Sequence, residues 1–373
     1  MEETNPVQKP EFLLAPMDGM TRASFRSVCF DYGADGATTE MIQSLAYGRA
    51  KKPMSSAFQE VLARYSNERN LAAQLIGSDP AAMAESARRL EALGRFDAID
   101  INMGCPARKV VGSGNGAALL KRPERAVEVM AAVKTATSLP VRLKLRLGWD
   151  AAHITAPFLV AQAEALGFQS VTLHGRTREQ MYLGPVDTRA IQAVCDAVRI
   201  PVYANGGVSC AADALTFMRD THAAGVAIGR AALKAPWIFE DIAALRRGGT
   251  VPRRRAPERA ALLIRLAALT CGHRPEAVAI CEMRRFCGWI LAGLTDCGAV
   301  LVRLNSVVTL DAFRALLEDY VNDLERRGDL DIHPELLPKQ TLDTVAHRQA
   351  RRMAKWMQNG VMTGEKDPSP RSG

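Results

Sequence analysis

Cys105 lies where a strand-like segment gives way to a loop, and two polar residues precede it on one face of that segment. The segment AIDINMG covers residues 98–104, and the two-residue period of a strand places Asp100 and Asn102 on the same face. A carboxylate, an amide and a thiol therefore lie close to one strand end. A cysteine taken at random is more often a small buried residue. Its position between Asn-Met-Gly and Pro106 favours a functional role.

Two later segments carry cations in positions that apolar residues would usually fill. In VRLKLR, residues 141–146, Arg142, Lys144 and Arg146 alternate with apolar residues. Three cations cannot lie side by side in a protein interior without an anion or a strongly polar ligand, because burial of an unpaired charge is costly. The segment SVTLHG is followed by further polar groups, and the set is His174, Arg176 and Arg178.

Eight strand-like segments, separated by helical segments, position these residues. They cover residues 12–16, 36–40, 72–77, 98–104, 141–146, 170–175, 201–206 and 225–230. One intervening helix has Asp79 as its expected N-cap, Pro80 at its first position and Gly94 after its last turn. Eight strand–helix repeats predict an α/β fold, a TIM (β/α)8 barrel. An open doubly wound sheet would normally stop near six strands, and no G-x-G-x-x-G opens the first helix.

Small residues follow the seventh and eighth of these segments. In a TIM barrel the loops after those two strands commonly bind phosphate. Gly206, Gly207 and Gly229 would let backbone N–H groups approach a ligand closely, and Arg230 adds a planar set of donors. One Gly-Gly pair usually marks only a turn, but small residues at two consecutive strand ends favour a phosphate site.

The chain changes character after about residue 245. No strand is predicted from 252 to 337, whereas 260–269, 278–291 and 310–325 have the pattern of amphipathic helices. We therefore expect a barrel at residues 1–245, a small C-terminal helical bundle at 252–345, and a basic, disordered tail at 346–373. The arginines of the linker, residues 253–255, are as consistent with solvated surface charge as with RNA contact.

The composition favours a reduced, cytoplasmic protein without a membrane span or a metal site. The 8 cysteines form no C-x-x-C pair, and the N-terminus lacks the layout of a signal peptide. No apolar run approaches the ~18 residues that a membrane helix needs. The net charge of +8, half of it in residues 346–373, gives weak support for a polyanionic partner.

Several motifs together resemble those of the bacterial tRNA-dihydrouridine synthases, most closely the B-type branch. The matching segments are LAPMDGMTRASFR, QLIGSDP, DINMGCPARKVV, GNGAALL, LKLRLGWD, LHGRTREQMYLGP and AIGRAALKAPWIF. The resemblance covers most of residues 12–330 and extends faintly through EMRRFCGWILAGL. It implies an FMN-dependent TIM barrel that uses NADPH to reduce uridine to 5,6-dihydrouridine in tRNA, and a helical C-terminal domain, residues 252–345, that binds the tRNA. We also expect a monomer.

The resemblance also assigns expected roles to individual residues. Cys105 matches the family's proton donor, and a thiol whose ordinary pKa is near ~8.5 is mostly protonated at neutral pH. Lys144 would stabilise the anion of reduced FMN. The expected FMN contacts are Pro16, Met17, Asp18, Gln74, Lys144, His174, Asn205, Gly206, Gly207, Gly229 and Arg230. The expected RNA contacts are Asn102, Arg108, Lys109, Arg176, Arg178, Arg284 and Arg285. The segment ARKVVGSGNGAALL, residues 107–120, is a candidate lid over the base.

Some positions depart from the family's usual pattern, and other functions stay open. The departures are Asp18 in place of Ala, Gly207 in place of Asp, Phe286 in place of His, and Lys234-Ala235 in place of Gly-Asn. The alternatives are a flavin oxidoreductase of small pyrimidines or enones, a synthase acting on ribosomal RNA, and an inactive barrel that only binds RNA or phosphate. The C-terminal helices argue against the first, and the retention of Cys105 and Lys144 argues against the last.

Overall fold

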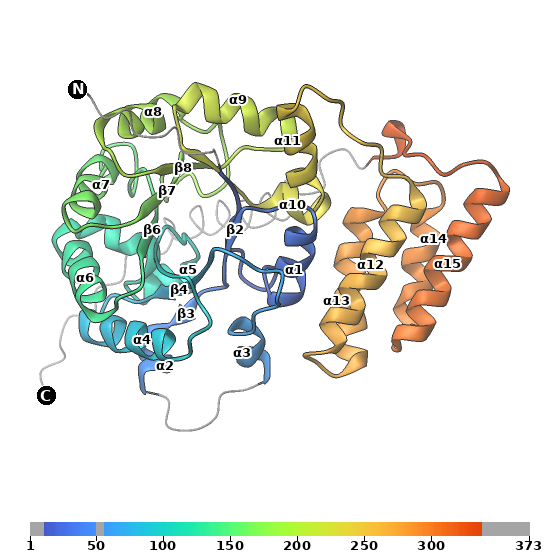
Figure 1. Ribbon diagram of the computed structural model, residues 1–373, viewed down its shortest axis with the longest axis horizontal. Coiled ribbons are helices and arrows are strands. Elements are labelled where there is room, and N and C mark those ends of the chain that lie inside the picture. The colour runs from blue at the N-terminus through green and yellow to red at the C-terminus, as the bar shows by residue number, and fades with distance from the viewer. Residues whose placement is uncertain (1–10, 50–55, 338–373) are drawn as a thin grey trace, which may run out of the picture.

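The computed structural model describes residues 11–49 and 56–337, and within them nine parallel strands form one closed sheet (Figure 1). The strands are β1 (Glu11–Leu14), β2 (Gly36–Thr38), β3 (Ile42–Gln43), β4 (Leu71–Ile76), β5 (Ala98–Met103), β6 (Val141–Arg146), β7 (Ser170–His174), β8 (Val202–Asn205) and β9 (Gly225–Ile228). Their order is β2-β1-β9-β8-β7-β6-β5-β4-β3, and the pairing of β2 with β4 closes the barrel. The predicted TIM barrel is confirmed.

All eight predicted strands are present, and β3 is the one that the sequence pattern missed. It contains two residues, and Ile42 pairs with Leu75 of β4 beyond the point where β2 ends. Because it continues the position of β2 around the barrel, the barrel keeps eight strand positions. Two residues are too few to show an alternating pattern.

Helices surround the barrel, and several have the ends that the sequence predicts. Those of the barrel are α1 (Ala23–Asp31), α2 (Ser44–Arg49), α3 (Ser56–Val61), α4 (Pro80–Ala92), α5 (Arg108–Gly112), η1 (Gly116–Lys121), α6 (Pro123–Ala136), α7 (Ala156–Ala165), α8 (Thr188–Ala197), α9 (Ala211–Thr221), α10 (Arg230–Lys234) and α11 (Ile238–Arg246). As predicted, Asp79 caps α4, accepting from Ala82 N at 2.8 Å, and Gly94 follows with a positive φ of 62°.

The two faces of the strands have different chemistry. The outward residues of β5 and β6, such as Ile101 and Leu143, are fully buried against the helices in the main apolar core. Inside the barrel, Leu13, Ala15, Tyr203 and Ala227 form a separate small apolar cluster. Polar side chains of β4, β5, β6 and β8 occupy the rest of the interior, and the alternation predicts those of β5 and β6.

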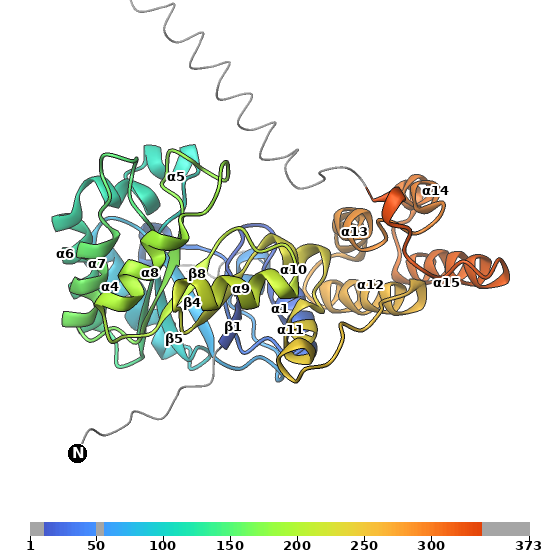
Figure 2. The same cartoon turned by 90° about the horizontal axis from the view of Figure 1, so that it is seen from above.

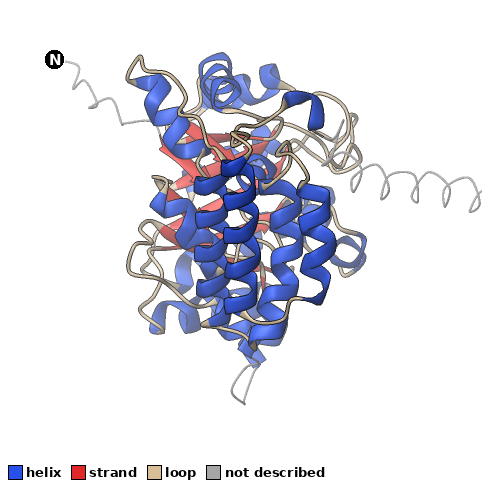
Figure 3. Cartoon of the chain, turned by 90° about the vertical axis from the view of Figure 1, so that its right-hand side faces the viewer, coloured by secondary structure: helices blue, strands red, loops and turns tan. Residues whose placement is uncertain are grey.

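In the part of the chain that the structure describes, four α-helices form a bundle beside the barrel. They are α12 (Ala256–Cys271), α13 (Glu276–Ile290), α14 (Cys297–Arg303) and α15 (Leu310–Arg326), with the short turns η2 (Leu304–Ser306) and η3 (Pro334–Leu336). Figure 3 shows this bundle in front of the strands. Three of the helices were predicted; α14, with seven residues, was not. The predicted disordered tail, 346–373, lies outside the described residues.

Apolar stacking and ion pairs join the bundle to the barrel. The rings of Phe25 on α1 and Phe286 on α13 stack with centroids 5.3 Å apart. Arg22 Nη1 lies 3.0 Å from Glu282 Oε1, and Arg274 Nε lies 2.6 Å from Glu60 Oε2. Phe286 therefore fills an apolar contact between the two parts.

Arg26 and Glu68 form a fully buried ion pair, and its loss is expected to destabilise the barrel. Arg26 Nε lies 2.6 Å from Glu68 Oε1, and both side chains have 0% exposure. Arg26→Met would leave the carboxylate buried without its cation, which typically costs about 3–5 kcal/mol. Urea unfolding measures the change. Arg88→Met, which removes an exposed partner of Glu85, is the control and should leave the midpoint unchanged; equal midpoints for both variants would contradict this account.

Candidate active site

A chain of buried side chains leads across the barrel interior to the backbone of Cys105. Asp100 Oδ2 accepts from Gln74 Nε2 at 2.7 Å, and Gln74 Oε1 accepts from Asn102 Nδ2 at 2.8 Å. Asn102 Oδ1 in turn accepts from the backbone N–H groups of Gly104 at 3.1 Å and Cys105 at 2.9 Å. The register of the sheet aligns these groups, because Gln74 pairs with Asp100 across β4 and β5. The strand thus fixes where the cysteine loop begins.

Arg146, at the end of β6, fixes the same loop from its other side. Its Nε donates to Gly104 O at 2.9 Å, while its Nη1 donates to Thr177 O at 3.0 Å and to Met181 O at 2.6 Å. Burial lowers the pKa of Arg146 to about 10, so the guanidinium remains charged at pH 7. One cation therefore ties the loop after β5 to the loop after β7.

The segment after Cys105 folds back against it through α5 and η1. Ala117 N donates to Cys105 O at 3.1 Å. Gly116 has a positive φ of 59°, and a Cβ there would lie 2.9 Å from Cys105 O and 3.2 Å from Cys105 Cβ. Only glycine allows this close approach without displacing the cysteine. Whether residues 107–120 move as a lid stays a prediction.

The surroundings of Cys105 keep its thiol protonated at neutral pH. Burial raises the pKa of the Cys105 thiol above its ordinary value, and the negative charge of Asp18 raises it further. Three groups lower this pKa in part: the backbone of Ala107 and the cations Arg146 and Lys144. The side chain is half-buried rather than sealed. A protonated thiol that remains accessible can act as a general acid.

Cations surround the neutral His174 at the ends of β6 to β9. Lys144 Nζ donates to Asn205 Oδ1 at 2.9 Å, and Asn205 Nδ2 donates to Ala227 O at 2.7 Å. Burial lowers the pKa of Lys144, and Arg146 lowers it further, whereas Asp100 raises it.

Burial also lowers the pKa of His174 well below its usual range. The cations that add to that effect are Arg146, Lys144, Arg176 and Arg230. This part of the mouth, the end of the barrel where the strands' carboxyl ends meet, therefore attracts anions.

The backbone beside these cations has no room for larger residues. Gly206 and Gly207 have positive φ angles of 109° and 77°. A Cβ on Gly206 would lie 2.5 Å from the ring of His174. Glycine therefore lets β8 end directly against the histidine.

The residues after β1 line the neighbouring part of the same mouth, because β1 pairs with β9. Pro16 and Met17 are half-buried, and Asp18 is exposed. Met17 Sδ lies 3.6 Å from the position of a Cβ on Gly229, which precedes Arg230 at the start of α10. The predicted FMN contacts after β1, β8 and β9 therefore lie at neighbouring strand ends.

The predicted RNA contacts in the barrel differ in how far they are exposed to solvent. Arg108 and Lys109 are exposed on α5, and Arg178 is half-buried after β7. Arg176 is buried, and its Nε and Nη2 donate to Gly184 O at 3.0 and 2.8 Å. Arg176 therefore supports the loop between β7 and α8.

The remaining predicted RNA contacts lie away from Cys105, on the helical bundle. Arg285 is exposed on α13, whereas Arg284 Nη2 donates to Asn305 O at 2.8 Å. In the linker, Arg254 forms an ion pair with Glu240, and Arg253 is exposed.

Tyr182 is a member of the site that the sequence pattern did not reveal. Its ring lies 6.3 Å from that of His174, and the guanidinium carbons of Arg146 and Arg230 lie 5.2 and 5.4 Å from its centroid. It belongs to an irregular loop, where no periodicity marks its position. Strand alternation identified Asp100 and Arg146 in the sequence, but it did not identify the groups to which these two side chains hydrogen-bond.

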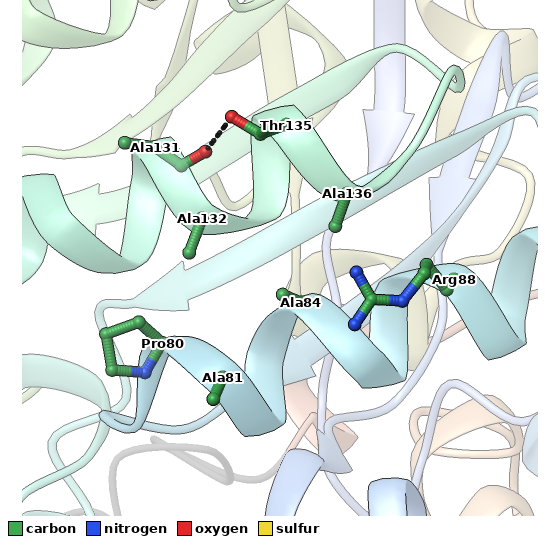
Figure 4. Close-up of a pocket in the computed structure, with 8 residues that line it drawn as sticks. All are labelled: Pro80, Ala81, Ala84, Arg88, Ala131, Ala132, Thr135 and Ala136. Carbon is green, nitrogen blue, oxygen red and sulfur yellow. Dashed lines mark hydrogen bonds between the residues drawn. The ribbon is translucent and has the colours of Figure 1, made fainter.

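A separate hollow of about 510 Å³ lies on the outer wall of the barrel, between α4 and α6 (Figure 4). Its lining is Pro80, Ala81, Ala84, Arg88, Ala131, Ala132, Thr135 and Ala136. It has one charged side chain, and Glu85 already accepts from it at 3.2 Å. The mouth is therefore the better candidate site.

Among the described residues no cluster of His, Cys, Asp and Glu suits a metal, and no helix is long and apolar enough to cross a membrane.

The fold and the site define an α/β-barrel protein whose mouth combines a protonated thiol with a ring of cations. The family model "Dihydrouridine synthase (Dus)" matches residues 13–323, and the chain belongs to this family.

Three curated relatives have the same kind of name. The "Probable tRNA-dihydrouridine synthase" of Rhodobacter capsulatus is 43% identical over 65% of this chain and 74% of its own. "tRNA-dihydrouridine synthase B" of Pseudomonas aeruginosa is 33% identical over 85% of this chain and 94% of its own. The protein of that name from Xanthomonas axonopodis pv. citri is 35% identical over 84% and 94%, respectively. The resemblance drawn from the motifs is confirmed.

Gly116→Ala is expected to displace Cys105. The new Cβ would approach Cys105 O to 2.9 Å, and the positive φ adds roughly 1–2 kcal/mol of strain. We expect faster maleimide labelling of Cys105, measured by peptide mass spectrometry, because the loop leaves its fixed position. The matched control is Gly112→Ala, whose Cβ meets nothing within 4 Å. Equal labelling rates in the two variants would contradict this role of Gly116.

Asp18→Ala is expected to lower the pKa of Cys105. Asp18 raises the pKa of this thiol, because its negative charge disfavours the thiolate. Its removal should shift the alkylation–pH profile of Cys105 toward lower pH, measured with iodoacetamide and peptide mass spectrometry. Asp311→Ala, an exposed change on the distant α15, is the control. A profile that does not shift, or shifts upward, would rule out this electrostatic influence.

Proposed function

We propose that this protein reduces uridine to 5,6-dihydrouridine in tRNA, with FMN as its cofactor and NADPH as the reductant. The observation that carries the proposal is the protonated Cys105 thiol, fixed at a mouth that is ringed by cations. Membership of the dihydrouridine synthase family supports the reaction, and the names of the relatives support tRNA as the substrate.

The residues at the mouth fit a flavin mononucleotide. The phosphate would lie at Gly206, Gly207, Gly229 and Arg230, where three residues without side chains let backbone N–H groups approach an anion and Gly206 and Gly207 have positive φ angles. Lys144, which is half-buried and donates to Asn205, would stabilise negative charge on the ring system. The remaining proposed contacts are Pro16, Met17, Asp18, Gln74 and His174.

Reduction of uracil requires a hydride at carbon 6 and a proton at carbon 5. Bound FMN, reduced by NADPH, would supply the hydride. Cys105 would donate the proton from the opposite face of the base and become a thiolate, which then regains a proton from solvent. Asn102 fixes the donor through the backbone N–H of Cys105. Arg146 and Lys144 favour the transient thiolate, since both lower the pKa of Cys105.

The target base must leave its stack to reach this mouth, so the RNA must be bound on both sides of it. Arg108, Lys109 and Arg178 would bind phosphates beside α5, while Arg284 and Arg285 would do so on α13. Asn102 and Arg176 lie deeper, and we assign them to the base and to the loop around it.

Cys105→Ala is expected to separate the two half-reactions. The variant should bind FMN and accept electrons from NADPH, because the change leaves the cations of the flavin site in place. Its rate of dihydrouridine formation in tRNA should fall by at least ~100-fold, since general acid catalysis typically contributes that much. Flavin absorbance and mass spectrometry of digested tRNA measure the two steps. Cys195→Ala on α8 is the matched control.

Other outcomes would contradict specific parts of the proposal. Unchanged tRNA reduction by Cys105→Ala would exclude the thiol as the acid. A wild-type protein that cannot be reconstituted with FMN would exclude flavin chemistry. Equal activity of the wild type on free uracil and on tRNA would favour an enzyme of small pyrimidines instead.

A further inference from the structure

Two cations lie over the indole ring of Trp149, in the loop after β6. Lys121 Nζ, at the end of η1, is 4.1 Å from the ring centroid, and Arg178 Cζ, after β7, is 4.6 Å from it. Trp149 and Arg178 are half-buried, whereas Lys121 is exposed. Cation–π attraction fixes both charged groups on one rigid ring. We call these three residues the indole cluster.

The indole cluster has more positive charge than its surroundings offset. Partial burial lowers the pKa of Arg178; nearby Glu179 opposes this, and Arg108 lowers it further. Arg178 Nε is buried and has no hydrogen-bond acceptor within the described part of the chain. A partly desolvated guanidinium beside a second cation is stabilised by any anion that reaches it.

The other nearby carboxylate is already engaged. Asp150 Oδ1 accepts from the backbone N–H groups of Ala152 and His153, both at 2.9 Å, and lies 2.7 Å from His153 Nδ1. Within the described residues it forms no ion pair with Lys121 or Arg178. An external anion is the better match for the excess charge.

The position of the indole cluster matches the path of an RNA that enters the mouth. Its three residues come from the segments after β5, β6 and β7, the same strand ends that surround Cys105. The helical bundle lies to one side of the barrel, and α5 lies over the barrel itself (Figure 2). The indole cluster and the bundle would thus bind the RNA at two separate places.

We propose that the indole cluster is a backbone clamp for the RNA substrate, in which Lys121 and Arg178 bind phosphodiester groups while Trp149 fixes their spacing. The inference rests on the proposed function and adds Trp149 and Lys121 to the substrate contacts. Phosphate is the matching chemistry, because cations over the indole leave less of its face for a base to stack on, and arginine donates to phosphate through a planar fork.

The salt dependence of tRNA binding tests the clamp. The plot of log affinity against log salt has a negative slope, and Lys121→Gln should reduce its magnitude by about 0.7–0.9, the change expected for one phosphate contact. Trp149→Leu should reduce the magnitude further, because both cations lose their support, whereas Trp149→Phe should retain most of the wild-type slope. Arg219→Gln, an exposed change on α9 with 74% side-chain exposure, is the control. FMN content and the unfolding midpoint show whether each variant is folded.

The results separate the clamp from the proposed function. Slopes for Lys121→Gln and Trp149→Leu that equal the wild-type slope would overturn the clamp, even if the wild type reduces tRNA normally. If the two variants give salt-dependence slopes of smaller magnitude but the wild type forms no dihydrouridine, the clamp is supported and the proposed reaction is contradicted. Because Lys121 is exposed, its variant keeps the test decisive if Trp149→Leu does not fold.

Discussion

The site depends on one constraint: polar side chains inside a barrel must find partners there, because water cannot supply them. Asp100, Gln74 and Asn102 satisfy one another in a chain, and the last acceptor of that chain receives the N–H group of Cys105. The position of the thiol is therefore set by the register of β4 against β5, not by the loop alone. A loop that carries a catalytic group gains its precision from the rigid strands beneath it.

The same interior sets the protonation of the site. Burial disfavours every charged form, so it raises the pKa of Cys105 and lowers that of His174. The thiol keeps its proton and the imidazole stays neutral, although several cations lie close by. The mouth thus combines a proton donor with an anion-binding ring. The proposed reaction needs both, since a proton is delivered while negative charge must be stabilised elsewhere.

Much of this arrangement follows from the sequence because strands impose a period of two. That period predicts that Asp100 and Asn102 point together and that Arg142, Lys144 and Arg146 face the barrel interior. It does not predict the partners of Arg146 at Thr177 and Met181, since these depend on an irregular loop.

The missing features have similar physical causes. β3 and α14 are too short to carry a clear period. The contact of Lys121 and Arg178 with Trp149 joins three loops that are far apart in the chain, so no local pattern marks it. Residues that act through backbone carbonyls or ring faces are generally less visible in a sequence than those that repeat along a strand.

The central claim is that the barrel interior holds Cys105 as the proton donor to the base. It is tested most directly by a single turnover of the reduced protein with tRNA in D2O, comparing the wild type with Cys105→Ser. The account predicts that the wild type places one deuteron at carbon 5, on the face opposite the hydride, and that the serine variant forms little product, because a hydroxyl is a far weaker acid. Product from Cys105→Ser at the wild-type rate and with the same stereochemistry would contradict it.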